Sequence, residues 1–258
     1  MGDTIAMRPS SPSPIRDVVS ATVIAGVALG LLAPALRPAR DAKASICLDH
    51  LRRIGAAARM YSDDWGGCLV PYAIASSGYS ARYTALLYPH YVQDIGVFAC
   101  PADHLDRSTL HAPSPTTFGV NWYISREVGS YWPSSSPQRL TAVKDPGHTI
   151  WAADTAPVSA ETAALPPAQW REDLKSAATA DIYYFYLPSD PETGAASVGW
   201  TTGNWESPAR IYRPFPRHGG RVNAAFYDGH AESVAASQFD PAVTQWGKPG
   251  CLWDNVAG

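Results

Sequence analysis

Hydrophobic positions divide this chain into an apolar segment, an amphipathic stretch and a region of short alternating runs. Residues 18–36 carry no charged side chain, and nineteen helical residues span roughly 28 Å, about the thickness of the hydrocarbon core of a bilayer. Directly afterwards, small and apolar residues recur at steps of three and four, the spacing of one helix face: Ala44, Cys47, Leu51, Ile54, Ala58 and Tyr61. The pattern predicts a membrane-spanning helix that continues into an amphipathic one.

Turn-forming residues set the boundaries predicted for these elements. Residues 1–17 are rich in Ser and Pro, which predicts a disordered, leader-like segment. The helix is expected over residues 18–61, kinked near Pro34 and Pro38, because a proline removes a backbone donor and crowds the carbonyl four residues earlier. The run Ser-Asp-Asp-Trp-Gly-Gly at 62–67 ends it, and residues 62–258 form a globular, β-rich head domain.

The apolar segment also fits two other interpretations. It ends in Ala33-Pro34-Ala35, a pattern that a signal peptidase could cut, and a uniformly apolar helix could instead lie in a protein core. The helical stripe that follows favours a retained anchor, since a cleaved leader has no reason to continue into one. More Lys and Arg follow the segment than precede it, which by itself places the body in the cytoplasm. The cysteines and the resemblance described below place the body outside.

Beyond residue 67, β-branched and aromatic runs bounded by glycine, proline or aspartate are typical of strands and loops. Strands are expected at 118–124, 149–153 and 182–187, and a short helix at 83–91. The intervening segments 126–140, 155–180 and 188–216 are expected to be loop-rich. The fold class predicted is α+β: one long N-terminal helix packed on an antiparallel β-sheet with long loops.

The clearest local element is a hairpin whose two alternating runs are joined by Asp228-Gly229. Asp-Gly in this position indicates a two-residue type I′ turn, in which both central residues take positive φ. That register pairs Tyr227 with His230. It places on one core face Val222, Ala224, Phe226 and Ala231.

Net charge and cysteine content limit which partners the protein can bind and which cellular compartment suits it. The 20 Lys and Arg against 23 Asp and Glu give a net charge of −3, which leaves no electrostatic footprint for nucleic acid. Cys47, Cys68, Cys100 and Cys251 are an even number in a chain with an export-like segment, so disulfides are expected, with three possible pairings. No Cys-x-x-Cys spacing points to zinc.

Several short motifs occur in order along the chain. The last of them consists of His218, nine intervening residues and then Asp228-Gly229. The earlier ones are Cys47-Leu-Asp-His-Leu-Arg-Arg-Ile-Gly55, Met60-Tyr-Ser-Asp-Asp64, Phe98-Ala-Cys-Pro-Ala-Asp103, Gly119-Val-Asn-Trp122 and Ala152-Ala-Asp-Thr155. The ordered set resembles a bacterial pseudopilin-like family with a prepilin-type N-terminal helix and a processing-associated domain named for His, nine residues and Asp-Gly. The resemblance covers nearly the whole chain from about residue 17.

The resemblance implies a pilin-like fold and a non-enzymatic subunit of a type II secretion or type IV pilus-like system. Such a subunit is anchored in the bacterial inner membrane with an extracytoplasmic head, or assembles into a filament, and its partners are the membrane and other pilin-like subunits. Aligned on the family's helix, Asp17 replaces the glutamate used in assembly, although it could also be a solvated cap at the membrane boundary. Pro12 and Ser13 fall where the prepilin peptidase needs glycine and a following aromatic, so its cleavage and methylation are not expected. The resemblance also matches Cys47 with Cys100 as one disulfide and leaves Cys68 with Cys251 as the second.

A metal-dependent hydrolase is the rival class, with His218, Asp154, Asp228 and His230 as candidate groups. Imidazole and carboxylate are suitable metal ligands and acid–base groups. Asp228 nevertheless has a structural reason in the turn, and His230 has one as the cross-strand neighbour of Tyr227. The chain contains no Gly-x-Ser-x-Gly, His-Glu-x-x-His or P-loop motif. We therefore expect no catalytic residue and no resident cofactor.

A binding module for sugars or proteins is the third class. Its candidate contacts are aromatic residues in or near predicted loops, namely Trp122, Tyr131, Trp132, Trp170, Trp200 and Trp205. Such aromatics also fill small cores beneath long loops. A bound Ca²⁺ ion is a further option, because oxygen ligands are available in loop-like sequence at Asp63, Asp64, Asp190 and Glu192.

Overall fold

The computed structural model describes residues 40–76, 79–103, 116–129, 137–174, 184–185, 211–240 and 251–252. The chain divides into two compact units, Met1–Ala42 and Lys43–Gly258. Only residues 40–42 of the first unit are described, and they are helical and exposed. The leader-like residues 1–17, the apolar segment 18–36 and Asp17 lie outside the described residues.

The second unit opens with a helix that is continuous through residue 64 and packs one side into the core. Cys47, Leu51 and Ile54 are fully buried, Tyr61 is nearly so, and Ala44 and Ala58 are half-buried, which confirms the stripe expected from the spacing. The charged side chains of this helix are all exposed, namely Asp41, Lys43, Asp49, Arg52, Arg53, Arg59, Asp63 and Asp64. The helix ends as expected in the turn 65–67, where Gly66 and Gly67 take positive φ.

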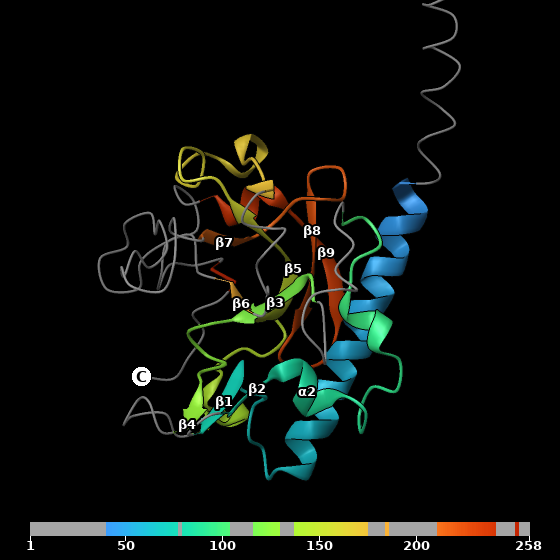
Figure 1. Ribbon diagram of the computed structural model, residues 1–258, viewed down its shortest axis with the longest axis vertical. Coiled ribbons are helices and arrows are strands. Elements are labelled where there is room, and N and C mark those ends of the chain that lie inside the picture. Colours follow the sequence, from blue (N-terminus) through green and yellow to red (C-terminus); the bar gives the residue numbers. More distant parts are fainter. Residues whose placement is uncertain are drawn as a thin grey trace, which may run out of the picture. The chain divides into compact units, whose positions relative to one another are not determined.

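A six-stranded sheet forms the centre of this unit (Figure 1), in the order β6-β3-β5-β8-β9 with β7 pairing separately to β5. Its strands are β3 (Phe118–Asn121), β5 (Ile150–Val158), β6 (Tyr184–Phe185), β7 (Ile211–Pro214), β8 (Arg221–Phe226) and β9 (Ala231–Ala235). The pair β3–β6 is parallel, and the other pairs are antiparallel.

A three-stranded sheet lies beside it, in the order β2-β1-β4. It consists of β1 (Ala73–Ser76), β2 (Tyr79–Arg82) and β4 (Val128–Gly129), with β1–β4 parallel. The helix α2 (Tyr83–Leu87) follows β2 directly. Four 3₁₀ helices complete the described elements: η1 (Ile95–Phe98), η2 (Leu140–Ala142), η3 (Pro167–Gln169) and η4 (Ala236–Phe239).

The large sheet is covered on both faces, because all nine residues of β5 are buried. Trp151 and Ala152 of this strand pack with Leu51 and Ile54 of the N-terminal helix in a first core cluster. The opposite face contributes to a second cluster, which includes Ile150, Ala153, Trp170, Phe185, Tyr212 and Phe226. This two-sided burial explains why β5 lacks an alternation of apolar and solvent-facing polar residues, and it also buries Asp154 and Thr155.

The predicted α+β, pilin-like fold class is wrong. The described chain is mixed α/β, because each sheet contains a parallel pair alongside antiparallel ones. The described residues contain two α-helices, and neither combines the length and the apolar character that a membrane span requires. The physical reason is visible in residues 40–64, whose outer face is charged, so that this helix is amphipathic and only one side is buried.

The hairpin exists, but its register is displaced by one residue from the prediction. Ala225 pairs with Ala231, while Phe226 N–H donates to the His230 carbonyl and Gly229 N–H donates to the Phe226 carbonyl. Gly229 takes a φ of +96°. These contacts define a three-residue loop with a type I turn and a glycine bulge, so the predicted two-residue turn is wrong.

The displaced register also changes which side chains share a face, since a slip of one residue exchanges the two faces of a strand. Val222, Ala224 and Phe226 lie together in the second core cluster, as expected. Ala231 lies instead in the first cluster, beneath the N-terminal helix. Elsewhere α2, β3, β5 and β6 fall within or overlap their predicted ranges, whereas β7 occupies a segment expected to be a loop.

Candidate functional site

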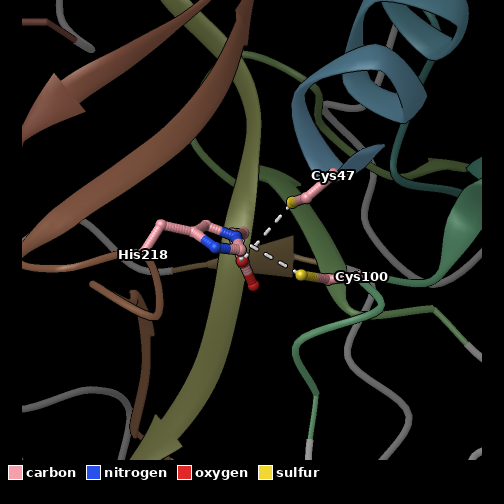
Figure 2. Close-up of side chains that lie close together, drawn as sticks. Cys47, Cys100 and His218 are labelled. Carbon is pink, nitrogen blue, oxygen red and sulfur yellow. Dashed lines mark hydrogen bonds and ion pairs between the residues drawn. The ribbon is translucent and has the colours of Figure 1, made fainter. Parts of the chain in front are cut away.

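Four separate elements deliver one chemically distinctive side chain each to a single point in the core (Figure 2). Cys47 comes from the N-terminal helix, Cys100 from the segment after η1, Asp154 from the middle of β5, and His218 from the connection between β7 and β8. Their sulfur, oxygen and nitrogen atoms all lie within 4.8 Å of one another. We call these four residues the CCDH cluster.

Short contacts link the members of the CCDH cluster. The His218 Nε2 atom lies 3.1 Å from Asp154 Oδ2 and 3.4 Å from the Cys100 sulfur. The Cys47 sulfur donates to the same Asp154 Oδ2 at 3.7 Å. Cys47, Cys100 and Asp154 are buried, and the His218 side chain is only 3% exposed. The cluster is therefore closed to solvent.

A two-glycine turn places His218. Residues His218 and Arg221 exchange backbone hydrogen bonds of 3.3 Å, and between them Gly219 and Gly220 take φ values of +63° and +81°. A Cβ atom at either glycine would have open space around it, so it is the backbone angle and not crowding that demands glycine. This turn has the pair of positive φ angles that the sequence pattern predicts for Asp228-Gly229.

Local hydrogen bonds likewise fix Cys100 at the end of η1. Its N–H donates to Thr117 Oγ1 at 2.6 Å, and its carbonyl accepts from Asp103 N–H at 3.0 Å. Ala102 N–H donates to the Cys100 sulfur at 3.4 Å. The Cys-Pro-Ala-Asp motif is therefore a tight turn that directs its sulfur inward and holds it with a backbone donor.

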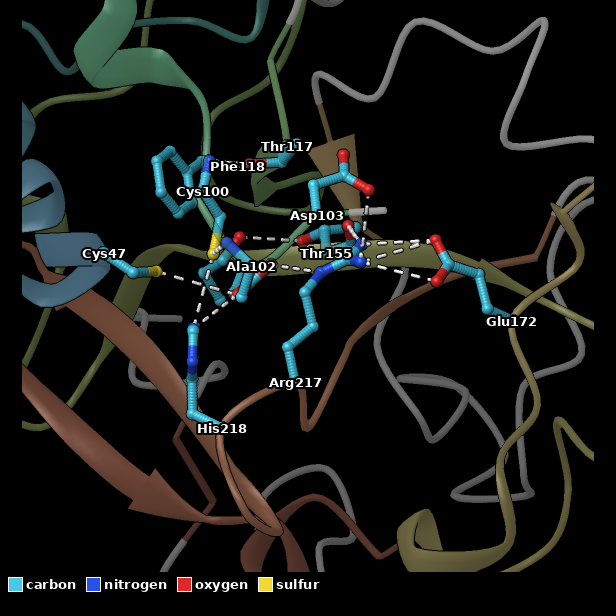
Figure 3. Close-up of polar contacts among 12 residues, drawn as sticks. Cys47, Cys100, Ala102, Asp103, Thr117, Phe118, Thr155, Glu172, Arg217 and His218 are labelled. Carbon is cyan, nitrogen blue, oxygen red and sulfur yellow. Dashed lines mark hydrogen bonds and ion pairs between the residues drawn. The ribbon is translucent and has the colours of Figure 1, made fainter. Parts of the chain in front are cut away.

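Arg217 lies next to the CCDH cluster and contacts one of the two oxygens of the Asp154 carboxylate (Figure 3). Arg217 Nε donates to Asp154 Oδ1 at 2.8 Å, which leaves Oδ2 to face the sulfurs and the imidazole. Its other guanidinium nitrogens lie 3.4 Å from Glu172 and 3.5 Å from Asp103, and Nη2 donates to the Thr155 carbonyl at 2.9 Å. All four charged side chains are at least nine-tenths buried.

These contacts perturb the ionisation of the CCDH cluster. Burial raises the pKa of Cys47, whereas the hydrogen bond from Cys47 lowers the pKa of Cys100 against the opposing effect of burial. Burial also opposes ionisation of Asp154, but the Arg217 charge and the His218 hydrogen bond hold its pKa below the ordinary value. Burial disfavours the imidazolium of His218, yet its hydrogen bonds to Asp154 and Cys100 raise its pKa to about 9. The arrangement thus pairs an imidazolium with a carboxylate and a thiol of lowered pKa.

The structure separates the histidine and aspartate residues that the sequence offered as one hydrolase site. His218 and Asp154 belong to the CCDH cluster. Asp228 and His230 pair with each other at 2.6 Å at the tip of the hairpin, and both side chains are 43% exposed. Among the described residues, the CCDH cluster is the group of Cys, His and acidic side chains with the geometry for an ion. Asp228 and His230 lie in the hairpin loop and are not members of the CCDH cluster.

The cysteines meet in part as the resemblance implied. Cys47 and Cys100 come together in the CCDH cluster, but no disulfide joins them, and none joins Cys68 to Cys251. Cys68 follows the turn 65–67 after the N-terminal helix and forms a β-bridge with Arg139. Cys251 lies in the second core cluster, on the opposite face of the sheet. Both predicted disulfides are absent from the structure.

The aromatic and acidic candidates that are described act as packing and surface groups. Trp122 stacks on Tyr72 with ring centroids 4.7 Å apart, and Trp170 is buried and donates to the Leu165 carbonyl. Asp63 pairs with Arg59, and Asp64 accepts from Tyr91. The remaining candidates lie outside the described residues: Tyr131, Trp132, Trp200, Trp205, Asp190 and Glu192.

Sequence reasoning named each member of the CCDH cluster but did not combine them, and it missed Arg217 with Asp103 and Glu172. The cluster could have been predicted from one observation, namely that each of its members lies in a different motif of the ordered set. No protein-family model matches the chain, and neither a curated protein nor a solved structure matches it.

Proposed function

We propose that this protein is a non-enzymatic subunit of a type II secretion or type IV pilus-like assembly, with residues 62–258 as its extracytoplasmic head. The observation that carries the proposal is the convergence of the family-like motifs. Each motif is weak alone, but motifs that are remote in sequence meet at one point of the structure. Convergence of this kind is expected if the motifs form a single unit and not if they match by chance.

The CCDH cluster is the centre of this convergence. Cys47 and Asp154 are 107 residues apart in sequence, and Cys100 and His218 are 118 residues apart. Each of the four comes from a different motif. Each motif contributes a side chain that can ionise, bind an ion or form a disulfide.

The ends of the first and last motifs also meet. A Cβ atom on Gly55, which ends the first motif, would lie 2.8 Å from the carbonyl oxygen of Gly229, which ends the last. A Cβ atom on Gly119, in the motif between them, would lie 2.7 Å from the backbone of Tyr184. Both glycines are therefore required by close approach of two backbones. The same physical cause, a backbone too close to admit a Cβ, therefore explains the glycine in both motifs.

The closed state of the CCDH cluster supports a structural role over a catalytic one. A catalytic group must reach the atom on which it acts. The Asp154 and His218 side chains are 0% and 3% exposed, and the cluster atoms contact one another instead of a cleft. In the described part of the chain, these two side chains therefore present almost no surface to a substrate.

The test places a photo-crosslinking residue in the full chain, in the cells that produce it. Ile46 and Met60 are suitable positions, since both are exposed and lie about four turns apart on the same outer face of the N-terminal helix. We expect protease added outside the cytoplasm to cleave the head, and crosslinks from these positions to further subunits. Glu232, which is exposed on β9, is the matched control position. A body that is digested only after lysis, with no crosslink above that of Glu232, would contradict the proposal.

A further inference from the structure

We propose that Cys47, Cys100, Asp154 and His218 bind one zinc-class divalent ion in tetrahedral coordination. The ion would be a structural centre that joins the N-terminal helix to the large sheet. The inference is independent of the assembly proposed above, since it rests on the four side chains alone.

The donor set fits this class of ion. Zinc is bound in proteins by thiolate sulfur, imidazole nitrogen and carboxylate oxygen, and its structural sites take four protein ligands with no open position. The CCDH cluster offers two sulfurs, one nitrogen and one oxygen, all buried. Hard cations such as Ca²⁺ and Mg²⁺ prefer oxygen ligands and would leave the sulfurs unused.

Three of the separations fit edges of a coordination tetrahedron. Zinc bonds of about 2.3 Å to sulfur and about 2.05 Å to nitrogen or oxygen place the ligand atoms about 3.6 Å apart when sulfur is involved, and about 3.3 Å apart otherwise. The observed separations are 3.4 Å for Cys100 sulfur to His218 Nε2, 3.7 Å for Cys47 sulfur to Asp154 Oδ2, and 3.1 Å for His218 Nε2 to Asp154 Oδ2. These three lie within about 0.2 Å of the expected edges, and the four ligand atoms all lie within 4.8 Å of one another.

Groups around the cluster hold two of the ligands in place. Arg217 occupies Asp154 Oδ1, so the carboxylate is fixed with only Oδ2 available to an ion. The Ala102 N–H donates to the Cys100 sulfur, a contact that stabilises a thiolate. An ion of this class binds the deprotonated sulfurs and a neutral imidazole nitrogen. The surroundings are thus arranged for one monodentate oxygen and one hydrogen-bonded sulfur.

A disulfide between Cys47 and Cys100 is the competing state, because it would consume both sulfurs that the ion needs. The two states make opposite predictions for the purified full chain. The zinc centre predicts about one equivalent of metal by mass spectrometry and two thiols that become reactive only after the ion is removed. The disulfide predicts no bound metal and a Cys47–Cys100 peptide under non-reducing conditions.

The experiment measures bound zinc in wild type, His218→Gln and Cys68→Ser. Cys68 is the matched control, since it lies outside the CCDH cluster. We expect loss of the zinc equivalent in His218→Gln, retention in Cys68→Ser, and a lower melting temperature of wild type with chelator. If His218→Gln does not fold, cobalt(II) reconstitution of wild type decides, because a tetrahedral thiolate site gives intense visible bands. Wild type without stoichiometric metal, zinc retained in a folded His218→Gln, a cobalt spectrum without these bands or a mapped Cys47–Cys100 disulfide would each overturn the proposal.

Discussion

Arg217 should contribute far more to stability than any exposed charge in the described chain. Its guanidinium is 2% exposed and is the counter-charge for three carboxylates, those of Asp103, Asp154 and Glu172, that are 4%, 0% and 8% exposed. Arg217→Ala would leave these carboxylates buried without it. Breaking a buried ion pair by removing one partner costs about 3–5 kcal/mol, because the remaining charge stays buried without that partner.

The magnitude can be read from a urea titration. With a slope of about 2 kcal/mol per molar, a loss of about 3–5 kcal/mol lowers the unfolding midpoint by about 1.5–2.5 M. The matched control is Arg59→Ala, which removes an exposed pair with Asp63 of 3.3 Å, whose side chains are 44% and 63% exposed. Exposed pairs of this spacing contribute about 0.3–0.5 kcal/mol, so its midpoint should move by about 0.2 M.

Unfolding should be followed by tryptophan fluorescence and far-ultraviolet circular dichroism together, so that coincident curves justify a two-state analysis. Added salt gives a second readout, because it screens the exposed Arg59 pair but not the buried Arg217 contacts. The reasoning is refuted if Arg217→Ala lowers the midpoint no further than Arg59→Ala does.

Two further substitutions test the close contacts of the large sheet. Gly119→Ala places a Cβ 2.7 Å from the Tyr184 backbone and should lower the free energy of unfolding by about 1–3 kcal/mol. The control is Gly96→Ala, which should cost less than about 1 kcal/mol because the nearest atom belongs to a flexible carboxylate 3.2 Å away. Equal effects of the two substitutions in thermal melts would contradict this. Tyr227→Phe removes the buried 3.0 Å hydrogen bond to Ser125 and should cost about 1–2 kcal/mol in the same measurement, and an unchanged melting temperature would argue against that bond.

The helix and the hairpin could be found from sequence because their signals are local. The stripe from Cys47 to Tyr61 depends only on a spacing of three and four, and the Asp228-Gly229 pair marks a reversal of the chain whatever surrounds it. The register of the hairpin was wrong because loop length depends on which residues pair, and β8 is buried on both faces. Even the polar Asn223 is buried, so β8 beyond Arg221 offers no solvent-facing side from which to count.

The sequence analysis named the four residues of the CCDH cluster but did not predict that they meet, and the reason is physical. His218 and Asp154 are 64 residues apart, and nothing in their local sequence states that β5 and the two-glycine turn are neighbours. Arg217 was overlooked because it stands beside the more suggestive His218. Its carboxylate partners Asp103, Asp154 and Glu172 lie 114, 63 and 45 residues away in sequence. Ion-pair partners at such separations leave no periodic signal.

The wide sequence separation within the CCDH cluster also has a consequence for how the chain matures. Contacts between distant residues form late, because loop-closure entropy opposes them until nearer contacts have shortened the loops. Cys47 is made early and must wait for β5 and for the turn at residue 218 before its partners are in place. During that interval Cys47, Cys68 and Cys100 are accessible to one another and to oxidants. Protection of the nascent thiols, and not the strength of the finished fold, should then limit the yield of correctly formed protein in an oxidising compartment.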